Sequence, residues 1–190
     1  MPIEYFFPKA FYYKDGIICE AENERLREVA AQVRAEIPRS TRENIYTSYG
    51  SEQNILERPA FASLREAIGR EVLEYLTLLE TREGMQCTIS NSWIGISEHG
   101  NYERMHTHDG AYISGVYYIQ TPPECGRIYF EELSDNLWAS KRTKSEHFET
   151  ISYEPKERRL ILFNSKVPHH VGQNNSGQER MALSFNITIL

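Results

Sequence analysis

The sequence lacks the features that mark several classes of protein. No segment reaches the roughly 20 apolar residues of a membrane-spanning helix, and the first residues have neither the basic region nor the apolar run of a signal peptide. Its three cysteines, Cys19, Cys87 and Cys125, are far apart and have no CxxC spacing. This argues against a disulfide framework or a thiolate zinc site, and we expect a protein of the reducing cytoplasm.

An excess of positive charge is also missing. The 190 residues carry a formal net charge of −6, whereas a sequence-independent nucleic-acid binder needs a basic face. Two short basic clusters, at 141–144 and 156–159, are expected to be solvated loops. We therefore expect neither a nucleic-acid partner nor a membrane partner, and composition leaves the oligomeric state open.

The first half of the chain has the periodicity of helices. Apolar residues recur at helical spacing in residues 23–37, which are followed by Pro38, and in residues 59–83. Pro59 suits a first helical turn and Gly84 suits a helix exit. We expect a short strand before these two helices and a polar loop between them.

The second half has the composition of strands. Segments rich in β-branched and aromatic residues alternate with turn residues, and they cover residues 86–97, 112–120, 126–132, 148–154, 158–163, 167–173 and 179–190. This spacing predicts a mostly β protein with flanking helices, a double-sheet jelly roll or barrel with two helices packed on one sheet. We expect a single domain over residues 1–190, with helical support in 1–85 and the β core in 86–190.

The last of these segments has two different faces. Apolar residues alternate from Met181 to Ile189, and small or polar residues alternate with them from Arg180 to Thr188. Because successive side chains of a strand point to opposite faces, the apolar face should pack on a covering layer. The other face is either solvated or lines a polar cavity, and the alternation alone does not distinguish the two.

Four histidines form two short clusters. His106 and His108 are two positions apart, so in an extended segment both rings point the same way. His169 and His170 are adjacent, so only one of them can face inward on a strand. Neutral imidazole is a common ligand of iron, zinc and copper. The two clusters could meet around one metal, although an HxH pair also occurs on ordinary polar strand faces.

An arginine close to the second cluster makes the pattern more specific. A hairpin turn is expected between strands 167–173 and 179–186. If Val171 lies opposite Arg180, then His169 and Arg180 share one face. An arginine inside a barrel needs an anion, and a carboxylate matches its fork of hydrogen bonds best. The pattern therefore indicates a metal with a bound carboxylate co-substrate.

Five stretches of the chain carry a resemblance to a known family. They are NSW, HGNYERMHTH, SGVYYI, RRLILFNSKVPHHVGQN and RMALSFN, and they lie between Asn91 and Asn186. The chain resembles the 2-oxoglutarate/Fe(II)-dependent oxygenases, in particular a small branch found in bacteria and phages. Members of this superfamily have a double-stranded β-helix and a glycine six residues before the first metal histidine, as Gly100 precedes His106.

The resemblance also implies a set of metal ligands. The usual ligands of the superfamily are two histidines and a carboxylate, in the order HxD/E…H. Here His108 stands at the carboxylate position, and the branch often has HxH there, so the implied ligands are His106, His108 and His169. Two alternatives stay open. Asp109 could replace His108, or the motif could begin at His108 and leave Gly110, and so an open position, where the carboxylate is expected.

Co-substrate contacts and chemistry follow from the same resemblance. Arg180 matches the arginine that binds the far carboxylate of 2-oxoglutarate, and Tyr118 matches a tyrosine that contacts it in prolyl-hydroxylase-like relatives. Ala182 stands where many relatives have a serine, and Trp93 is expected to be a core residue. The implied cofactors are Fe(II), 2-oxoglutarate and O2. The implied reaction releases succinate and CO2 and hydroxylates an unactivated C–H of an amino acid, peptide or small metabolite.

Two rival functions remain at this point. One is a cupin-like three-histidine metal dioxygenase without 2-oxoglutarate, in which Arg180 would bind the substrate's own carboxylate. The other is a non-catalytic jelly-roll binding protein. In each case loops 39–57 and 133–147, the second with the basic side chains of 141–144, are expected to surround the mouth of the site, because long connections on a rigid scaffold often carry recognition.

Overall fold

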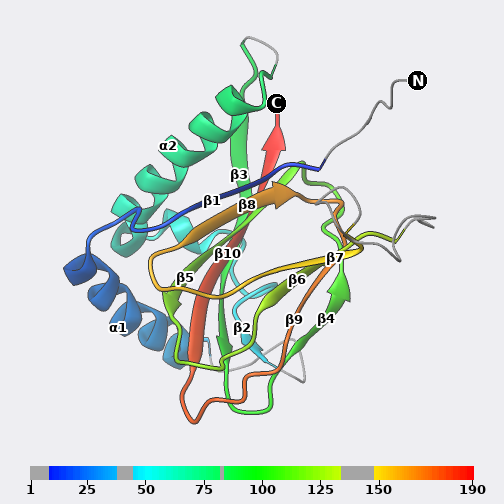
Figure 1. The fold of residues 1–190 in the computed structure, drawn as a ribbon. Helices are drawn as coiled ribbons and strands as arrows, with labels where there is room; N and C mark the ends of the chain where they lie inside the picture. The colour runs from blue at the N-terminus through cyan, green and yellow to red at the C-terminus, as the bar shows by residue number, and fades with distance from the viewer. Residues whose placement is uncertain (1–8, 38–44, 82–83, 134–147) are drawn as a thin grey trace.

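Two antiparallel sheets face each other, and two helices cover the outer side of the larger sheet (Figure 1). The computed structural model describes residues 9–37, 45–81, 84–133 and 148–190. The helices are α1 (Glu20–Glu36) and α2 (Ala62–Leu78), and the short 3-10 helices η1 (Ile55–Glu57) and η2 (Pro59–Phe61) precede α2.

The predicted jelly roll is confirmed by the order of the strands. The larger sheet has the order β1-β8-β5-β10-β3-β2, and the smaller has the order β4-β9-β6-β7. The strands are β1 (Phe11–Lys14), β2 (Tyr46–Thr47), β3 (Cys87–Ser97), β4 (Glu103–His106), β5 (Ile113–Gln120), β6 (Ile128–Glu131), β7 (Thr150–Tyr153), β8 (Leu160–Asn164), β9 (His169–Val171) and β10 (Arg180–Ile189).

Helix α2 ends earlier than its periodicity predicts. The prediction ran to residue 83, but the helix ends at Leu78 because Glu80 takes a left-handed conformation, with φ 51°. The amide of Thr81 then bonds to the carbonyl of Leu76, and the amide of Glu80 to that of Thr77. These are the two hydrogen bonds of a Schellman motif, in which glycine is the usual left-handed residue. The stop was missed because glutamate occupies that position.

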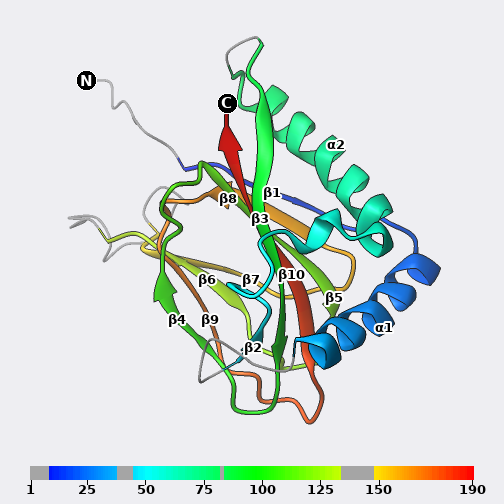
Figure 2. The same cartoon turned by 180° about the vertical axis from the view of Figure 1, so that it is seen from behind.

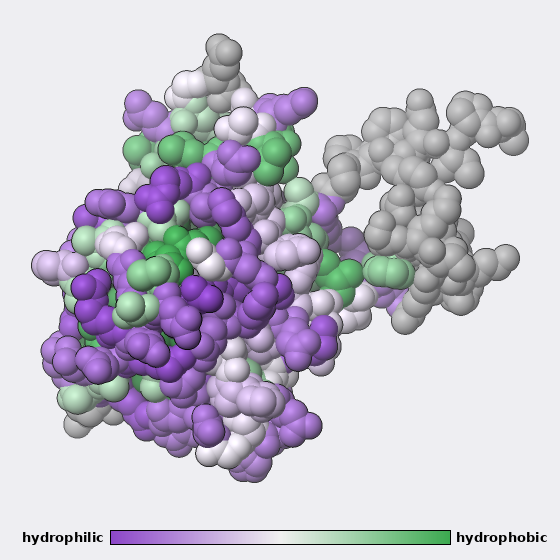
Figure 3. All heavy atoms as spheres, turned by 60° about the vertical axis from the view of Figure 1, so that its left-hand side comes forward, coloured by the Kyte–Doolittle hydropathy of each residue, from purple (hydrophilic) through white to green (hydrophobic). Residues whose placement is uncertain are grey.

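The helices and the apolar face of β10 form the main core. Both helices lie on the side of the larger sheet that is turned away from the smaller one (Figure 2). Buried residues of α1, α2 and β10 meet there, among them Leu26, Ala30, Val33, Leu64, Ile68, Val72, Met181, Leu183, Phe185 and Ile187. The predicted covering layer for this face of β10 is therefore present. The helix side brought forward in Figure 3 is mainly hydrophilic, as expected for amphipathic helices whose apolar faces are buried.

A second, smaller core lies between the two sheets. Its buried members come from β5, β6, β8 and the segment before β9, and they are Val116, Tyr118, Ile128, Phe130, Ile161, Phe163 and Val167. The polar face of β10 borders this inner space, because Arg180, Ala182 and Ser184 all line one cavity between the sheets. The alternation of β10 thus separates a hydrophobic layer from a cavity.

The predicted hairpin between 167–173 and 179–186 is wrong. Strand β9 pairs with β4 and β6, whereas β10 pairs with β3 and β5. The connection between them crosses from one sheet to the other, and the side-chain amide of Asn174 holds it by donating to the carbonyl of Ser97 at 2.7 Å. The two strands still line the same cavity, because they face each other across it.

The segments outside the two cores differ in part from the predicted loops. The region 39–57 was predicted as a loop, but its described part contains β2 and η1. The cluster 141–144 and most of the loop 133–147 lie outside the described residues. Among the described helices, none has the length and apolar character needed to cross a membrane. The cysteines Cys19, Cys87 and Cys125 are free thiols in this structure.

A glycine in β5 provides a test of the main core. Gly115 pairs with Phe185 of β10, and a Cβ at this position would lie 2.3 Å from the phenylalanine ring. Gly115→Ala should therefore lower the free energy of unfolding by about 1–3 kcal/mol, the usual cost of overpacking. Urea unfolding of the variant against the parent measures this change.

Gly69 of α2 is the matched control. A Cβ there would meet nothing within 4 Å, so Gly69→Ala should raise the free energy of unfolding by about 0.5–1 kcal/mol. Equal effects of the two substitutions would contradict the packing of Phe185 on the glycine.

Candidate metal centre

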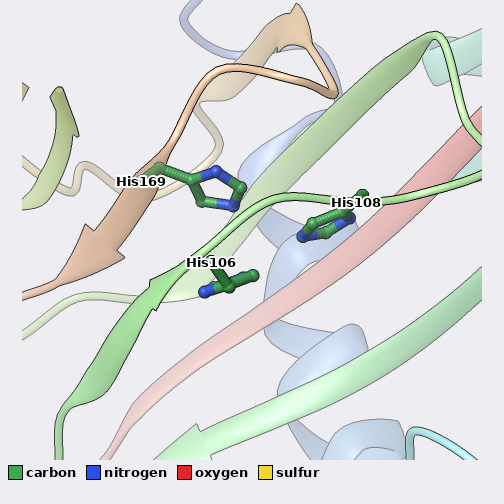
Figure 4. Close-up of side chains that lie close together, drawn as sticks. All are labelled: His106, His108 and His169. Atoms are coloured by element: carbon green, nitrogen blue, oxygen red, sulfur yellow. The ribbon is translucent and has the colours of Figure 1, made fainter. Parts of the chain in front are cut away.

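Three histidines from two segments come together at the cavity. His106 ends β4 and His169 begins β9, and the two are direct partners across these neighbouring strands. His108 follows two residues after His106. Each ring offers one nitrogen, and the three nitrogens lie within 4.8 Å of one another. Figure 4 shows the rings turned toward a common space, so the two clusters of the sequence form one group.

Backbone carbonyls determine the tautomers of two of these rings. Nδ1 of His106 lies 2.7 Å from the carbonyl oxygen of Arg104, and Nδ1 of His169 lies 2.9 Å from that of Val167. A carbonyl oxygen only accepts, so Nδ1 carries the hydrogen in both rings and Nε2 keeps a free lone pair. Metal-binding histidines are usually held in this way.

A side chain has the same role for the third ring. Nδ1 of His108 lies 2.5 Å from Oδ1 of Asn186 in β10. With an acceptor at each Nδ1, the rings present their Nε2 atoms as donors, and a set of three convergent imidazole nitrogens suits iron or another first-row transition metal. The residues present therefore fit a bound metal ion.

His169 is neutral at neutral pH because of its surroundings. Its side chain is buried, and the rings of Phe163 and Phe130 lie 4.8 and 5.9 Å from it. Burial, and next the neighbouring His106, lower the pKa of His169 to about 3. A ligand ring must give up its proton to bind a metal, and in His169 this cost is already removed. His170 points the other way and stacks on Tyr129, with 4.8 Å between the ring centroids.

Asp109 lies away from the three histidines. Its side chain is 92% exposed and forms an ion pair with Lys166 at 2.7 Å. That pairing lowers the pKa of Asp109 below its usual value. Gly110 follows with φ 82°, and the chain turns there before it enters β5. The structure therefore gathers nitrogen donors and keeps the carboxylate of Asp109 at the surface.

Arg180 and Tyr118 lie in the same cavity as the histidines. Arg180 is 5% exposed, and its Nη1 donates to the carbonyl oxygens of Cys125 and Gly126 at 3.0 and 3.2 Å. Within the described part of the chain, no carboxylate lies within 4.0 Å of this guanidinium. A buried guanidinium with no described carboxylate nearby to balance its charge is suited to bind an anionic ligand.

The hydroxyl of Tyr118 could also donate a hydrogen bond to a ligand in the cavity. The residue is 3% exposed, and no hydrogen bond joins its hydroxyl to another described residue. Burial raises the pKa of Tyr118 to about 12, so the hydroxyl keeps its hydrogen and can donate. Buried tyrosine hydroxyls normally have a partner, which is consistent with a ligand in the cavity.

Trp93 lies on the cavity wall, and its prediction as a core residue is wrong. Its ring lies 5.7 Å from that of His108 and 5.0 Å from that of Tyr49. The sequence contains a signal that could have shown this. In β3 the neighbours Ile94 and Ile96 are fully buried in the helix-covered core, so strand alternation places Trp93 on the opposite face. Ile45 and Thr47, from the segment 39–57 that was expected at the mouth of the site, also line the cavity, as does Glu103, which was not predicted.

Comparison with known proteins identifies a family. Residues 91–186 match the sequence model of the family described as "Putative 2OG-Fe(II) oxygenase". A search of curated proteins found no match.

Solved structures share the fold at low sequence identity. A prolyl-4-hydroxylase from Pseudomonas putida is 16% identical, with 94% of this chain and 92% of that chain covered and a TM-score of 0.64. HygX from Streptomyces hygroscopicus, solved with nickel, 2-oxoglutarate and hygromycin B, is 13% identical, with 95% and 83% covered and a TM-score of 0.66. The α-ketoglutarate-dependent epimerase SnoN from nogalamycin biosynthesis is 12% identical, with 95% and 76% covered and a TM-score of 0.64. At these identities the similarity establishes the fold.

The lowered pKa of His169 predicts an acid sensitivity of the metal-free protein. An unfolded histidine titrates near pH 6.5, whereas His169 in the fold titrates near pH 3. Below about pH 6.5 the unfolded chain binds a proton that the folded protein does not bind. The free energy of unfolding should therefore fall as the pH decreases from about 6.5 toward 3.

Urea unfolding of the metal-free protein between about pH 7 and pH 4 measures this dependence. His169→Gln should lose this part of it, and His170→Gln, which changes the outward-facing neighbour, should retain it. A His169→Gln variant with the pH dependence of the parent would contradict the burial of a neutral ring.

Proposed function

Because the chain belongs to the 2OG-Fe(II) oxygenase family, we propose that it is an Fe(II)- and 2-oxoglutarate-dependent dioxygenase acting as one domain over residues 1–190. The expected substrate is an amino acid, a peptide or a small metabolite, and the expected outcome is hydroxylation of an unactivated C–H bond. One observation carries the proposal. Three convergent imidazole nitrogens and a buried arginine, which no carboxylate of the described residues approaches within 4.0 Å, line a single cavity.

His106, His108 and His169 would hold the iron through their Nε2 atoms. When bound, iron and 2-oxoglutarate supply the oxidising power, with O2 as oxidant and with succinate and CO2 as products. The protein contributes position and environment. The acceptors at each Nδ1 hold the three rings in place, and Phe130 and Phe163 exclude water from one side of His169.

Arg180 and Tyr118 would hold the far carboxylate of 2-oxoglutarate. The bonds from Nη1 to Cys125 and Gly126 fix the guanidinium plane, and a planar fork can bind a carboxylate through two parallel hydrogen bonds. The hydroxyl of Tyr118 would donate a further hydrogen bond. Ala182 has no hydroxyl to add, so these two residues carry the anchoring in this proposal.

The rival functions have less support. A cupin-like dioxygenase without 2-oxoglutarate does not account for the family match over residues 91–186. A non-catalytic jelly roll does not account for three rings that each offer a nitrogen within 4.8 Å of the others. Hydroxylation is the proposed outcome because a prolyl-4-hydroxylase has this fold, and the epimerase SnoN shows that the same fold also supports another outcome. Trp93 and Tyr49 form an aromatic wall beside His108, where a substrate would lie.

The ligand assignment predicts which substitutions remove iron. Changing His106, His108 or His169 singly to Ala should abolish turnover and lower the iron bound after anaerobic reconstitution. His170→Ala is the matched control, because its ring points out of the cavity, and it should keep the metal.

Asp109→Ala tests the carboxylate alternative in the same assay. It should leave iron bound, because the Asp109 side chain lies at the surface with Lys166. Loss of iron comparable to that of His106→Ala would promote the carboxylate to a ligand and contradict a three-histidine site.

The co-substrate assignment predicts a separate defect for Arg180. Removing one partner of a buried charged pair costs about 2–5 kcal/mol, so Arg180→Ala should weaken 2-oxoglutarate binding by roughly 30-fold or more. Arg180→Lys should recover only part, because an ammonium group does not reproduce the planar fork. Both variants should still bind iron, because the guanidinium is not a ligand.

Anaerobic titration of the Fe(II) protein with 2-oxoglutarate measures this affinity. The growth of the metal-to-ligand charge-transfer absorption band reports the amount bound. If Arg180→Ala binds 2-oxoglutarate as tightly as the parent, the assignment fails and the cupin-like alternative becomes the better one. A coupled assay for succinate over amino acids, peptides and small acids then identifies the substrate.

A further inference from the structure

The third histidine is held differently from the other two. His106 and His169 each bond through Nδ1 to the backbone carbonyl two residues earlier in the chain. His108 bonds instead to the side chain of Asn186, 78 positions away in β10. The partner of its Nδ1 is therefore a side chain, which can be substituted. His108 is also the residue that stands where the superfamily pattern has a carboxylate.

Asn186 belongs to a closed ring of hydrogen bonds around His108. Its Oδ1 accepts from Nδ1 of His108 at 2.5 Å and from Oγ of Ser114 at 2.7 Å. Oγ of Ser114 lies 2.9 Å from Oγ of Ser165. The ring closes where the backbone amide of His108 donates to the carbonyl of Ser165, also at 2.9 Å. We call the three side chains of Ser114, Ser165 and Asn186 the relay.

The relay is buried and built on neighbouring strands. Asn186, Ser114 and Ser165 are 6%, 1% and 0% exposed. Strand β5 lies between β10 and β8, so Ser114 is the direct partner of Asn186, and Ser165 follows the end of β8. Solvent is excluded from three polar side chains whose hydrogen bonds converge on one ring. In a low-dielectric setting, such networks hold a single arrangement.

The direction of each bond follows from the number of hydrogens. A serine hydroxyl has one hydrogen. Ser114 donates it to Asn186, so Ser165 must donate to Ser114. Two donors then converge on the carboxamide oxygen of Asn186, which can only accept. If the amide nitrogen faced His108 instead, it would donate to Nδ1, and the hydrogen of the neutral ring would move to Nε2, where the metal should bind.

We propose that the relay of Asn186, Ser114 and Ser165 is a positioning device that makes His108 a metal ligand. It holds the ring as the Nδ1–H tautomer and directs Nε2 toward His106 and His169. Asn186 is thus a positioning residue that acts through His108 and does not touch the metal. This inference rests on the proposed function of the three-histidine site and assigns the reason why a histidine works at the carboxylate position.

The first test reads the tautomer in the metal-free protein. Long-range ¹H–¹⁵N spectra, recorded where the rings are neutral, should show His108 as the Nδ1–H tautomer in the parent. Asn186→Ala should lose this preference, and Asn186→Asp should keep it, because a carboxylate oxygen also accepts. Asn91→Ala is the matched control. Asn91 is the direct partner of Asn186 in β3, and no hydrogen bond joins its side chain to a described histidine, so its removal should leave His108 unchanged.

The second test measures affinity for Co(II), a redox-stable probe of nitrogen donors. Partners that orient a metal-binding histidine are typically worth 10–100-fold in affinity, so Asn186→Ala should weaken Co(II) binding by about that factor. Ser114→Ala should also weaken Co(II) binding, because it removes the hydrogen bond that keeps the Asn186 carboxamide from rotating by half a turn. Asn186→Asp should bind as the parent does. In a His108→Ala background, Asn186→Ala should cause no further loss, because the residue acts only through that ring.

The outcomes separate this inference from the proposed function. If the parent binds Co(II) and Asn186→Ala binds it equally, or if the double variant loses affinity beyond His108→Ala, the relay is not a positioning device. If the parent binds neither Co(II) nor Fe(II), the proposed function fails, while the tautomer of His108 still tests the relay. If Asn186→Ala does not fold, Ser114→Ala and Asn186→Asp decide the result. Loss of the Nδ1–H tautomer and of affinity in Asn186→Asp would also overturn the proposal.

Discussion

The structure depends on one constraint, the alternation of side chains along β10. This strand lies inside the larger sheet, between β5 and β3, and its two faces meet different environments. The odd-numbered side chains from Met181 to Ile187 pack under the helices. The even-numbered ones face the cavity or its edge, with Arg180 and Ser184 on the wall and Asn186 beside His108. A shift of one residue would bury the arginine under the helices and open the hydrophobic face to the cavity.

The cavity is organised by charge as well as by shape. At one end lies the buried guanidinium of Arg180, whose hydrogen bonds within the described residues go to backbone carbonyls. At the other end lie three imidazoles, and burial keeps His169 uncharged. Three neutral nitrogen donors bring no negative charge to a divalent metal, and no described carboxylate lies within 4.0 Å of the Arg180 guanidinium. A dianion such as 2-oxoglutarate would bring the balancing charge, and this would account for a buried arginine that has no carboxylate partner among the described residues.

In the proposed metal site a histidine takes the place of the usual carboxylate ligand, and this substitution would impose a structural requirement. A carboxylate can bind a metal through either oxygen, whereas an imidazole binds only if the hydrogen is on the other nitrogen. Two of the rings meet this need through backbone carbonyls close in sequence. The third relies on polar residues from β5, β10 and the end of β8. In the jelly roll these strands are neighbours, so the fold brings the required acceptor to the ring.

Periodicity alone predicted much of this protein. The apolar spacing of α1, the strand segments of the second half and the two faces of β10 all follow from local sequence, because each helix or strand repeats its environment every few residues. The HxH pair and Arg180 were predicted as site residues from their chemistry and from resemblance to a family, and the structure brings them to one cavity. The end of α2 was missed because a glutamate at a left-handed position does not differ locally from a helical one.

Only the tertiary structure decided how these pieces meet. It placed β9 and β10 in opposite sheets rather than in one hairpin, which local turn residues cannot distinguish. It turned Asp109 to Lys166 at the surface and Trp93 to the cavity, and it joined His108 to Asn186. The sequence determined which side chains were available and which face of each element they occupied. Contacts between residues far apart in the chain depend on how the sheets stack, and that stacking is a property of the whole core.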